Sequence, residues 1–261
     1  MIASTGDLID GQASSEIISL GNENLVCSNI EDYYIDVFGA VGASLKDYPV
    51  ICGGHHPDPF LWFKSYTSNK CYVYKNHTWQ FLGNMANDRA YAAAIVYDNS
   101  LYIFGGNGFR WWNPFRTLTA SEIISKEGDG IKSTKITDLK IALSMHAITW
   151  INDTVSIITG GKVKCTPWPY PDESLSSSWY FNHVTKLYDE GPVLLKGRYG
   201  HASGTLIDHG TNETIPVVSG GWVNSSIISD STEFLVNGIW TNAKLNNKVT
   251  KSNKTDKTFS V

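Results

Sequence analysis

The chain has 261 residues, 42% of them hydrophobic and 12% aromatic, and its formal net charge is −4 at pH 7. Such a chain can bury a sizeable core, and it lacks the excess of basic residues that is typical of nucleic-acid-binding proteins. No apolar run approaches the roughly 18 residues of a transmembrane helix, so we expect neither a membrane span nor a nucleic-acid partner. The first residues also lack the basic and apolar regions of a signal peptide.

A pair of glycines recurs four times along the chain, each time at the end of a short apolar run. The runs read YPVICGG, LYIFGG, VSIITGG and IPVVSGG, and the pairs are Gly53 and Gly54, Gly105 and Gly106, Gly160 and Gly161, and Gly220 and Gly221. Successive pairs are 52 (105 minus 53), 55 and 60 residues apart, which indicates an internal repeat. Glycine suits a strand that ends in crowded backbone, because it has no Cβ and adopts positive φ.

In chain order, residues 1–31 match only the last two strands of the repeated unit, in SSEIISL and ENLVCSNI. Clear strand pairs follow in later units, such as CYVY and TWQFLG around an Asn-His turn, or RAYAAAIVY and LYIFGG around Asp98 and Asn99. Four antiparallel strands in each complete unit predict a β-propeller blade, since one such sheet buries its faces only by stacking on neighbours. The complete units occupy 32–83, 84–138, 139–191 and 192–243, and a polar, lysine-containing tail occupies 244–261.

The pattern resembles the Kelch repeat over most of residues 1–243. Besides the glycine pairs, the resemblance rests on aromatic residues in third strands, tryptophans in fourth strands and arginines that begin first strands: Tyr72, Tyr74, Tyr180, Trp79, Trp240, Arg89 and Arg198. The unit that starts near Leu143 departs from the pattern, because it has leucine in place of arginine and no tryptophan in its fourth strand.

The resemblance implies an all-β, Kelch-type β-propeller with four complete four-stranded blades and a partial N-terminal blade. Kelch propellers commonly have six blades, so we expect the chain to be a fragment. Closure of the ring in an unusual way is the alternative.

Cys52 ends a second strand and Cys71 begins the third strand of the same unit. Neighbouring antiparallel strands can be joined by a disulfide, and a pair of buried reduced thiols is the alternative. Sequons at Asn76, Asn152 and Asn212 fall in turns that should share one end of the propeller, where N-glycosylation is expected. Disulfide and glycans would favour an extracellular over a cytoplasmic location, which the sequence alone leaves unknown.

The opposite end should carry the loops that follow second strands and those that precede first strands. Tryptophan and arginine are concentrated in these loops, and both residue types dominate binding hot spots on rigid scaffolds. The alternative is that the aromatic residues pack against one another and the arginines bind backbone carbonyls between blades. The predicted binding residues are Trp62, Arg89, Arg110, Trp111, Trp112, Trp168, Arg198 and Trp222.

Catalytic patterns are weak. His55 and His56 precede Asp58, but adjacent residues of an extended segment point apart, so solvated side chains explain them better than a metal site. His146 and His201 occupy equivalent places in successive units, which indicates a role in the repeat. We therefore expect no catalytic residue, metal or cofactor.

The sequence thus predicts a non-catalytic interaction module whose aromatic and basic loop face binds a protein, a peptide or a glycan. Two alternatives follow from the resemblance. One is the substrate-recognition part of a cullin-type ubiquitin ligase adaptor, in which a BTB domain precedes the Kelch blades. The other is a Kelch-type enzyme, such as a sugar epimerase or a copper-dependent oxidase.

Overall fold

In the computed structural model, the described residues are 2–6, 13–20, 25–29, 37–46, 48–56, 66–110, 113–163, 173–207, 213–224 and 227–242, with backbone alone at 2–29, 110 and 113–115. Every regular element among them is a β-strand, and no helix in this part of the chain could cross a membrane. The predicted all-β class is therefore confirmed.

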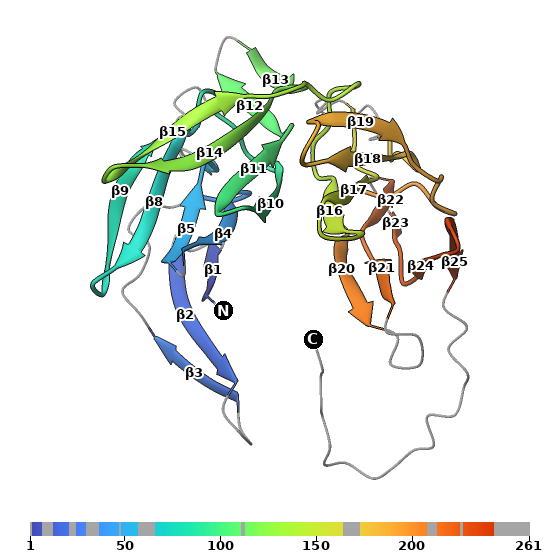
Figure 1. The fold of residues 1–261 in the computed structure, drawn as a ribbon, viewed down its shortest axis with the longest axis horizontal. Coiled ribbons are helices and arrows are strands. Elements are labelled where there is room, and N and C mark those ends of the chain that lie inside the picture. Colours follow the sequence, from blue (N-terminus) through green and yellow to red (C-terminus); the bar gives the residue numbers. More distant parts are fainter. Residues whose placement is uncertain are drawn as a thin grey trace.

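Four antiparallel sheets of four strands each form the blades of a β-propeller (Figure 1). Blade 1 contains β4 (Val41–Leu45), β5 (Tyr48–Cys52), β8 (Lys70–Lys75) and β9 (Thr78–Asn84). Blade 2 contains β10 (Ala93–Tyr97), β11 (Ser100–Phe104), β14 (Ser121–Glu127) and β15 (Gly130–Lys135). Blade 3 contains β16 (Ala147–Trp150), β17 (Val155–Thr159), β18 (Ser178–Asn182) and β19 (Leu187–Glu190). Blade 4 contains β20 (Ala202–Ile207), β21 (Thr214–Ser219), β24 (Thr232–Val236) and β25 (Ile239–Asn242).

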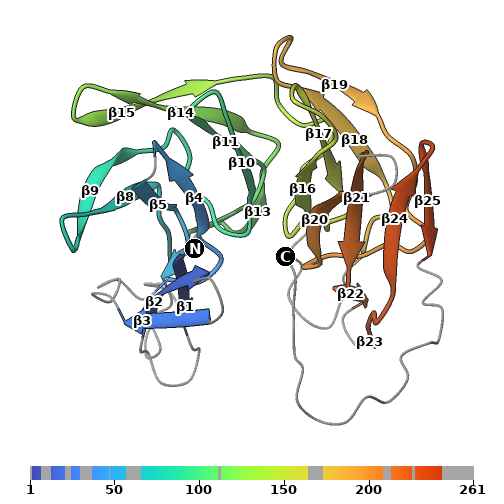
Figure 2. The ribbon, with the colours of Figure 1, turned by 60° about the horizontal axis from the view of Figure 1, so that its bottom comes forward.

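The blades follow one another in chain order along an arc (Figure 2). Their first strands lie innermost, and β4 contacts β10, β10 contacts β16, and β16 contacts β20. The fourth strands β9, β15, β19 and β25 lie at the periphery. This arrangement places the faces of neighbouring sheets against each other, as the repeat predicts.

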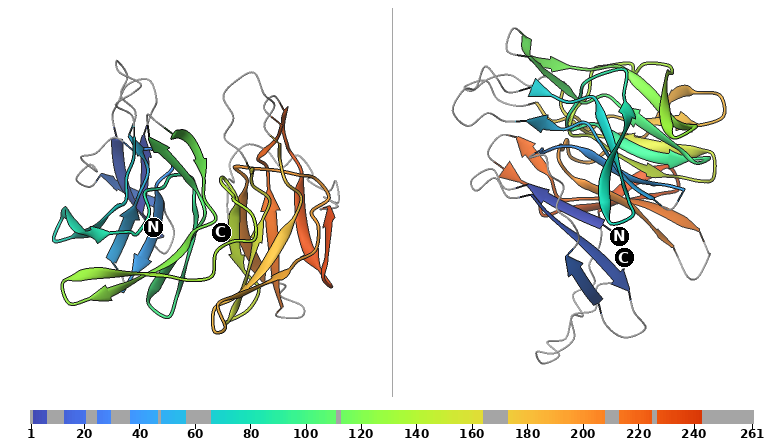
Figure 3. Two further views of the ribbon diagram at one scale, coloured as in Figure 1. Left: turned by 90° about the horizontal axis from the view of Figure 1, so that it is seen from above. Right: turned by 90° about the vertical axis from the view of Figure 1, so that its left-hand side faces the viewer.

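The N-terminal residues form a three-stranded sheet of β1 (Ile2–Gly6), β2 (Ala13–Leu20) and β3 (Leu25–Asn29). It continues the arc beyond blade 1, on the side away from blade 2 (Figures 2 and 3). The sequence predicted β2 and β3 as the only strands here, and this was wrong by one strand. β1 pairs with β2 along its whole length, but its sequence IASTG lacks the apolar run and glycine pair that identify the other second strands.

Short hairpins extend the connections that follow three of the glycine pairs. They are β6 (His55–His56) with β7 (Tyr66–Thr67), β12 (Asn107–Arg110) with β13 (Asn113–Thr117), and β22 (Trp222–Asn224) with β23 (Ile227–Ile228). We call the end of the propeller that carries these hairpins and the loops leading into first strands the hairpin face.

The opposite end carries the tight turns within each sheet. Asn76 lies in the turn between β8 and β9, and Asn152 lies between β16 and β17, so these two sequons share this end and are exposed. Asn212 lies outside the described residues. Asn76 and Asp98 have φ of 54° and 46°, as two-residue hairpin turns require.

Glycine is required where second strands end, because the next blade comes very close. A Cβ on Gly105 would lie 2.5 Å from the carbonyl oxygen of Leu143, in the loop leading into blade 3. The neighbouring Gly106 donates its N–H to that same oxygen at 2.7 Å. The backbone of Gly105 and Gly106 has φ of 57° and 97°, which other residues rarely adopt.

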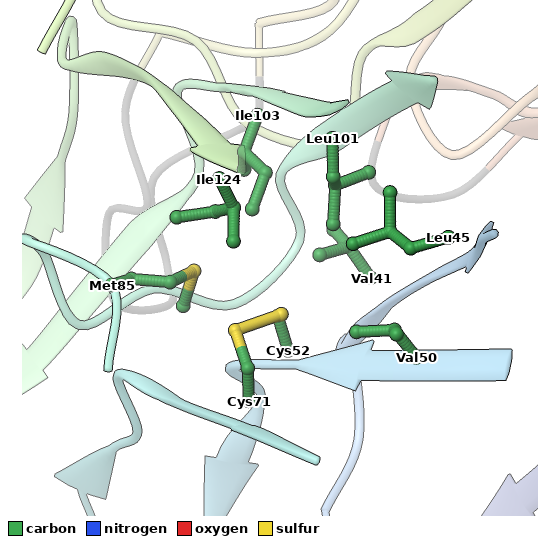
Figure 4. Packing of buried hydrophobic residues seen from close by; sticks show 9 residues of the cluster. All are labelled: Val41, Leu45, Val50, Cys52, Cys71, Met85, Leu101, Ile103 and Ile124. Carbon is green, nitrogen blue, oxygen red and sulfur yellow. A yellow bond between two sulfur atoms is a disulfide. The ribbon is translucent and has the colours of Figure 1, made fainter. Parts of the chain in front are cut away.

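The core between blades 1 and 2 contains the predicted disulfide (Figure 4). Cys52 and Cys71 are direct cross-strand partners on β5 and β8, their Cα atoms are 4.1 Å apart, and both are at most 1% exposed. The disulfide belongs to one cluster with aliphatic side chains from both blades, including Leu101 and Ile103 of blade 2. The predicted covalent link is therefore confirmed, and it forms part of the packed interior.

Reduction of this disulfide should destabilise the protein. The link closes a loop of 19 residues, and a loop of that length contributes about 3 kcal/mol by restricting the unfolded chain. Urea unfolding with and without a thiol reductant measures the difference in unfolding free energy. The variant Cys52→Ala/Cys71→Ala should not respond to the reductant; an equal response in that variant, or none in the natural chain, would contradict the prediction.

Candidate functional site

The two repeat arginines of the hairpin face lie in the loops that lead into β10 and β20, and both are buried. Arg89 is 1% exposed and Arg198 is 0% exposed. Arg89 donates from Nη1 to the carbonyl oxygens of Gly105 and Ala120 at 2.7 and 2.8 Å, and from Nη2 to Glu122 Oε1 at 2.5 Å. Burial lowers the pKa of Arg89, and the charge of Glu122 opposes this shift.

Arg198 repeats the same contacts in blade 4. Its Nη1 donates to the carbonyl oxygens of Gly220 and Ser231, and its Nη2 donates to Glu233 Oε1 at 2.5 Å. The prediction that Arg89 and Arg198 face a partner is therefore wrong. Their loops do lie at the predicted end, but each guanidinium turns inward to satisfy the carbonyls where its own second and third strands separate.

Glu122 and Glu233 complete the arrangement, although neither was among the residues predicted from the sequence. Glu122 also accepts the N–H groups of Ala86 and Asn87, at 2.7 and 3.3 Å. Glu233 likewise accepts the N–H groups of two residues of its own incoming loop, Leu195 and Lys196, at 2.8 and 3.2 Å. Each glutamate thus fixes the loop that delivers its arginine. The signal was present in the sequence, because SEIIS and TEFLV carry glutamate at the same place.

Blades 1 and 3 replace both members of this ion pair together. The strand register places Tyr72 and Trp179 where blades 2 and 4 have glutamate. The positions equivalent to the arginines hold Val37 and Leu143, and Leu143 packs in the same cluster as Trp179. A buried charge without its partner is costly, so the two positions change as a unit. This explains the leucine that departs from the Kelch pattern.

Hydrogen bonds join the hairpins of blades 1 and 2 into one surface. Thr67 on β7 donates from its hydroxyl to Asp88 at 2.6 Å and accepts the N–H of Phe109 on β12 at 2.9 Å. Asp88 also pairs with Arg116 at 3.5 Å. Because Thr67 is only 2% exposed, this link is shielded from water and holds β7 against β12.

His55 belongs to an aromatic cluster on this surface. Its ring lies 4.7 Å from Phe38 and 5.0 Å from Phe109, measured between centroids. Burial, with a smaller effect from His56, lowers the pKa of His55 to about 4. The imidazole is therefore neutral at pH 7 and serves as a packing group. Within the described ranges, no three histidine, cysteine, aspartate or glutamate side chains are close enough to hold a metal ion.

Exposed apolar side chains gather on the hairpin of blade 4. Trp222 is 39% exposed, and Ile227 and Ile228 are 55% and 63% exposed. Trp222 pairs with Ile228 across β22 and β23, and its backbone makes two hydrogen bonds with Tyr199. Of the predicted binding residues, only Trp222 is shown at the surface. Trp62, Trp111, Trp112, Trp168 and the side chain of Arg110 lie outside the described residues.

Three further histidines are buried between blades. His146 and His201 come close to the glycine pairs of the preceding blades, so both are positioned by the repeat. Burial is the main cause that lowers the pKa of each to about 3. His183 packs among aromatic rings at the opposite end, and burial lowers its pKa to about 4. All three are neutral at pH 7.

A scan of the sequence against protein-family models matches none of them, and a search of curated proteins finds no relative. The resemblance to Kelch repeats therefore rests on the residues of this chain alone, together with the propeller that they form.

The ion pair in blade 4 should be strongly coupled. Arg198→Leu alone leaves the Glu233 carboxylate buried without its cation, and Glu233→Trp alone leaves the guanidinium unpaired, so each should cost about 3–5 kcal/mol of stability. Arg198→Leu/Glu233→Trp installs the pair found in blade 3 and should cost less than the sum of the two. Urea unfolding of all three variants measures the coupling. Additive effects would show that the residues act independently.

Stability should fall with acidity because of His146 and His201. Their folded-state pKa values lie below 6.5, so the unfolded chain binds protons first, and stability is complete above about pH 6.5 and lost as the pH falls from there. Each fully buried histidine contributes about 1.4 kcal/mol per pH unit between these values. Urea midpoints from pH 7 to pH 5 measure the slope. His146→Ala/His201→Ala should reduce the slope, and the lowered pKa values of His55 and His183 account for the part that remains; an unchanged slope would assign it to other groups.

Proposed function

We propose that this chain is a Kelch-type propeller that acts as a non-catalytic interaction module and binds a protein or peptide through its hairpin face. The observation that carries the proposal is the exposed cross-strand pair of Trp222 and Ile228 beside Ile227. Tryptophan on a rigid backbone is the residue type most enriched in binding hot spots, and the aliphatic neighbours extend the apolar contact.

The support beneath this surface is rigid. Trp222 exchanges two backbone hydrogen bonds with Tyr199, at 2.8 and 3.0 Å, and Tyr199 follows the buried Arg198. The ion pair of Arg198 with Glu233 thus fixes the loop on which the hairpin rests. A partner that binds this face loses little free energy in ordering it, which is the advantage of a preorganised site.

Further exposed aromatic surface lies on the hairpin of blade 1. Tyr66 is 47% exposed and stacks on His56 with ring centroids 4.7 Å apart. The two hairpins share one end of the propeller, so an extended partner can contact more than one blade. No observation on the described residues favours the ligase-adaptor or the enzyme alternative.

Replacement of Trp222 should remove binding without unfolding the protein. Peptides selected on the natural chain from a displayed random library should bind Trp222→Ala about thirtyfold more weakly, since loss of a hot-spot tryptophan costs about 2 kcal/mol or more. The melting temperature should change by less than about 2 °C, as for other surface substitutions.

Leu187→Ala is the matched control, because Leu187 is 57% exposed on β19 at the end with the tight turns. It should leave peptide binding unchanged. Selected peptides that bind Trp222→Ala as well as the natural chain would contradict the proposed surface. A large fall in melting temperature for Trp222→Ala would assign the tryptophan to packing.

A further inference from the structure

A cavity of about 230 Å³ lies between blades 1 and 2, at the end of the propeller that carries the tight turns. It is therefore separate from the hairpin face. Its apolar floor consists of Leu45, Val50, Val73 and Leu82 from blade 1 and Ile131 from blade 2. Leu45 and Val50 belong to the core cluster shown in Figure 4, so core side chains bound the cavity on its inner side.

The corresponding space between blades 2 and 3 is filled by four rings. Tyr97, Tyr102 and Trp150 surround His183, and their centroids lie 4.9, 4.8 and 4.7 Å from its ring. The imidazole is held in this cluster by its hydrogen bond with the hydroxyl of Ser156, at 3.0 Å. Aromatic rings thus occupy this part of the second inter-blade space.

The strand registers show why the first space stays open. The positions of the four rings are taken in order by smaller or more flexible side chains: Leu45, Val50, Val96 and Lys126. Leu45 and Val50 stand in place of the two tyrosines, and Val96 stands in place of the tryptophan. Lys126, whose charged end extends to solvent, stands in place of the histidine. The backbone is the same, and three of these four side chains, Leu45, Val50 and Lys126, line the cavity, which we therefore attribute to the missing ring volume.

The mouth of this cavity is basic. Lys46, Lys75 and Lys126 line it, against the single described carboxylate of Asp129. All three lysines are exposed, and none takes part in the ion pairs formed within the described residues. Lys75 lies over the ring of Tyr48, which also lines the cavity, at 5.4 Å. Ammonium groups above an apolar floor attract a ligand that is anionic at one end and apolar at the other.

We propose that this cavity binds a small organic acid with an apolar body, namely an aryl or branched-alkyl group that carries a carboxylate. The volume suits one ring and a short chain, because a dry cavity of about 150 Å³ accommodates benzene. The apolar body would occupy the place that the rings take between blades 2 and 3, and the carboxylate would lie among the three lysines.

Calorimetric titration with 4-phenylbutyrate tests the proposal. A ligand of this size should bind with a Kd of about 1 mM. The neutral analogue 4-phenylbutanol should bind at least about tenfold more weakly, and the cationic 4-phenylbutylamine should not bind measurably, because the lysines repel it. Equal affinities for the three compounds, or no binding of 4-phenylbutyrate at 10-fold higher concentration than the expected Kd, would overturn it.

Variants locate the site. Lys75→Gln/Lys126→Gln should weaken 4-phenylbutyrate about tenfold and abolish its preference over the alcohol, whereas Lys196→Gln, an exposed lysine at the hairpin face, should have no effect. Val50→Tyr, which copies Tyr102, should fill the cavity and prevent binding. Because Val50 is only 1% exposed and that variant can lose stability, the lysine variants decide the matter. Unchanged affinity in the double lysine variant would overturn the proposal.

Trp222→Ala separates this site from the proposed function. It should leave the titration with 4-phenylbutyrate unchanged, since Trp222 lies at the other end of a different blade. Failure of the protein to select peptides therefore does not contradict binding of the acid in the cavity. Failure to bind the acid likewise does not contradict peptide binding at the hairpin face. Loss of acid binding in Trp222→Ala would contradict the assignment of the ligand to this cavity.

Discussion

One backbone hydrogen bond recurs between each of blades 1 to 3 and the blade that follows it, and it accounts for the glycine pairs of the repeat. The second glycine of a pair donates its N–H to the carbonyl of the residue that leads into the following blade. Gly54, Gly106 and Gly161 donate to Arg89, Leu143 and Arg198 in this way, at 2.7 to 2.8 Å. The contact brings two backbones so close that a Cβ on the first glycine of these three pairs would clash with the same carbonyl. The glycine pair is thus a requirement of blade-to-blade packing.

The residue that offers this carbonyl also determines the interior of its own blade. When this residue is arginine, its guanidinium binds a carbonyl oxygen at the end of the second strand and the glutamate of the third strand. Arg89 does this with Gly105 and Glu122. When it is leucine, an aromatic ring takes the place of the glutamate, as Trp179 does beside Leu143. Both solutions occupy equivalent positions in the strand register. Each blade has either the arginine–glutamate pair or the aliphatic–aromatic pair. The backbone is therefore more similar between blades than the side chains are.

Glycine spacing and strand alternation were sufficient to predict the blades and to place Cys52 and Cys71 on neighbouring strands, because both follow from local chain geometry; they left open whether the thiols form a disulfide. The direction of a loop side chain does not follow from this geometry. Arg89 and Arg198 lie at the predicted end of their blades and still point inward, since the carbonyls of Gly105 and Gly220 need a donor there. Of the predicted aromatic face, the described residues contain Trp222 alone. β1 was not predicted because its composition is not typical of the other second strands. It is a strand because it pairs with β2.

The three spaces between blades share a backbone and differ in how they are filled. Aromatic rings close the space between blades 2 and 3, and Trp240 is buried between blades 3 and 4 with its indole N–H bonded to Pro192. The space between blades 1 and 2 has aliphatic walls and a cavity, so it lacks the dispersion contacts that the rings provide. The disulfide belongs to the core cluster between these same two blades. A covalent link that restricts the unfolded chain by about 3 kcal/mol can offset the missing contacts, and the cavity can then persist without loss of the fold.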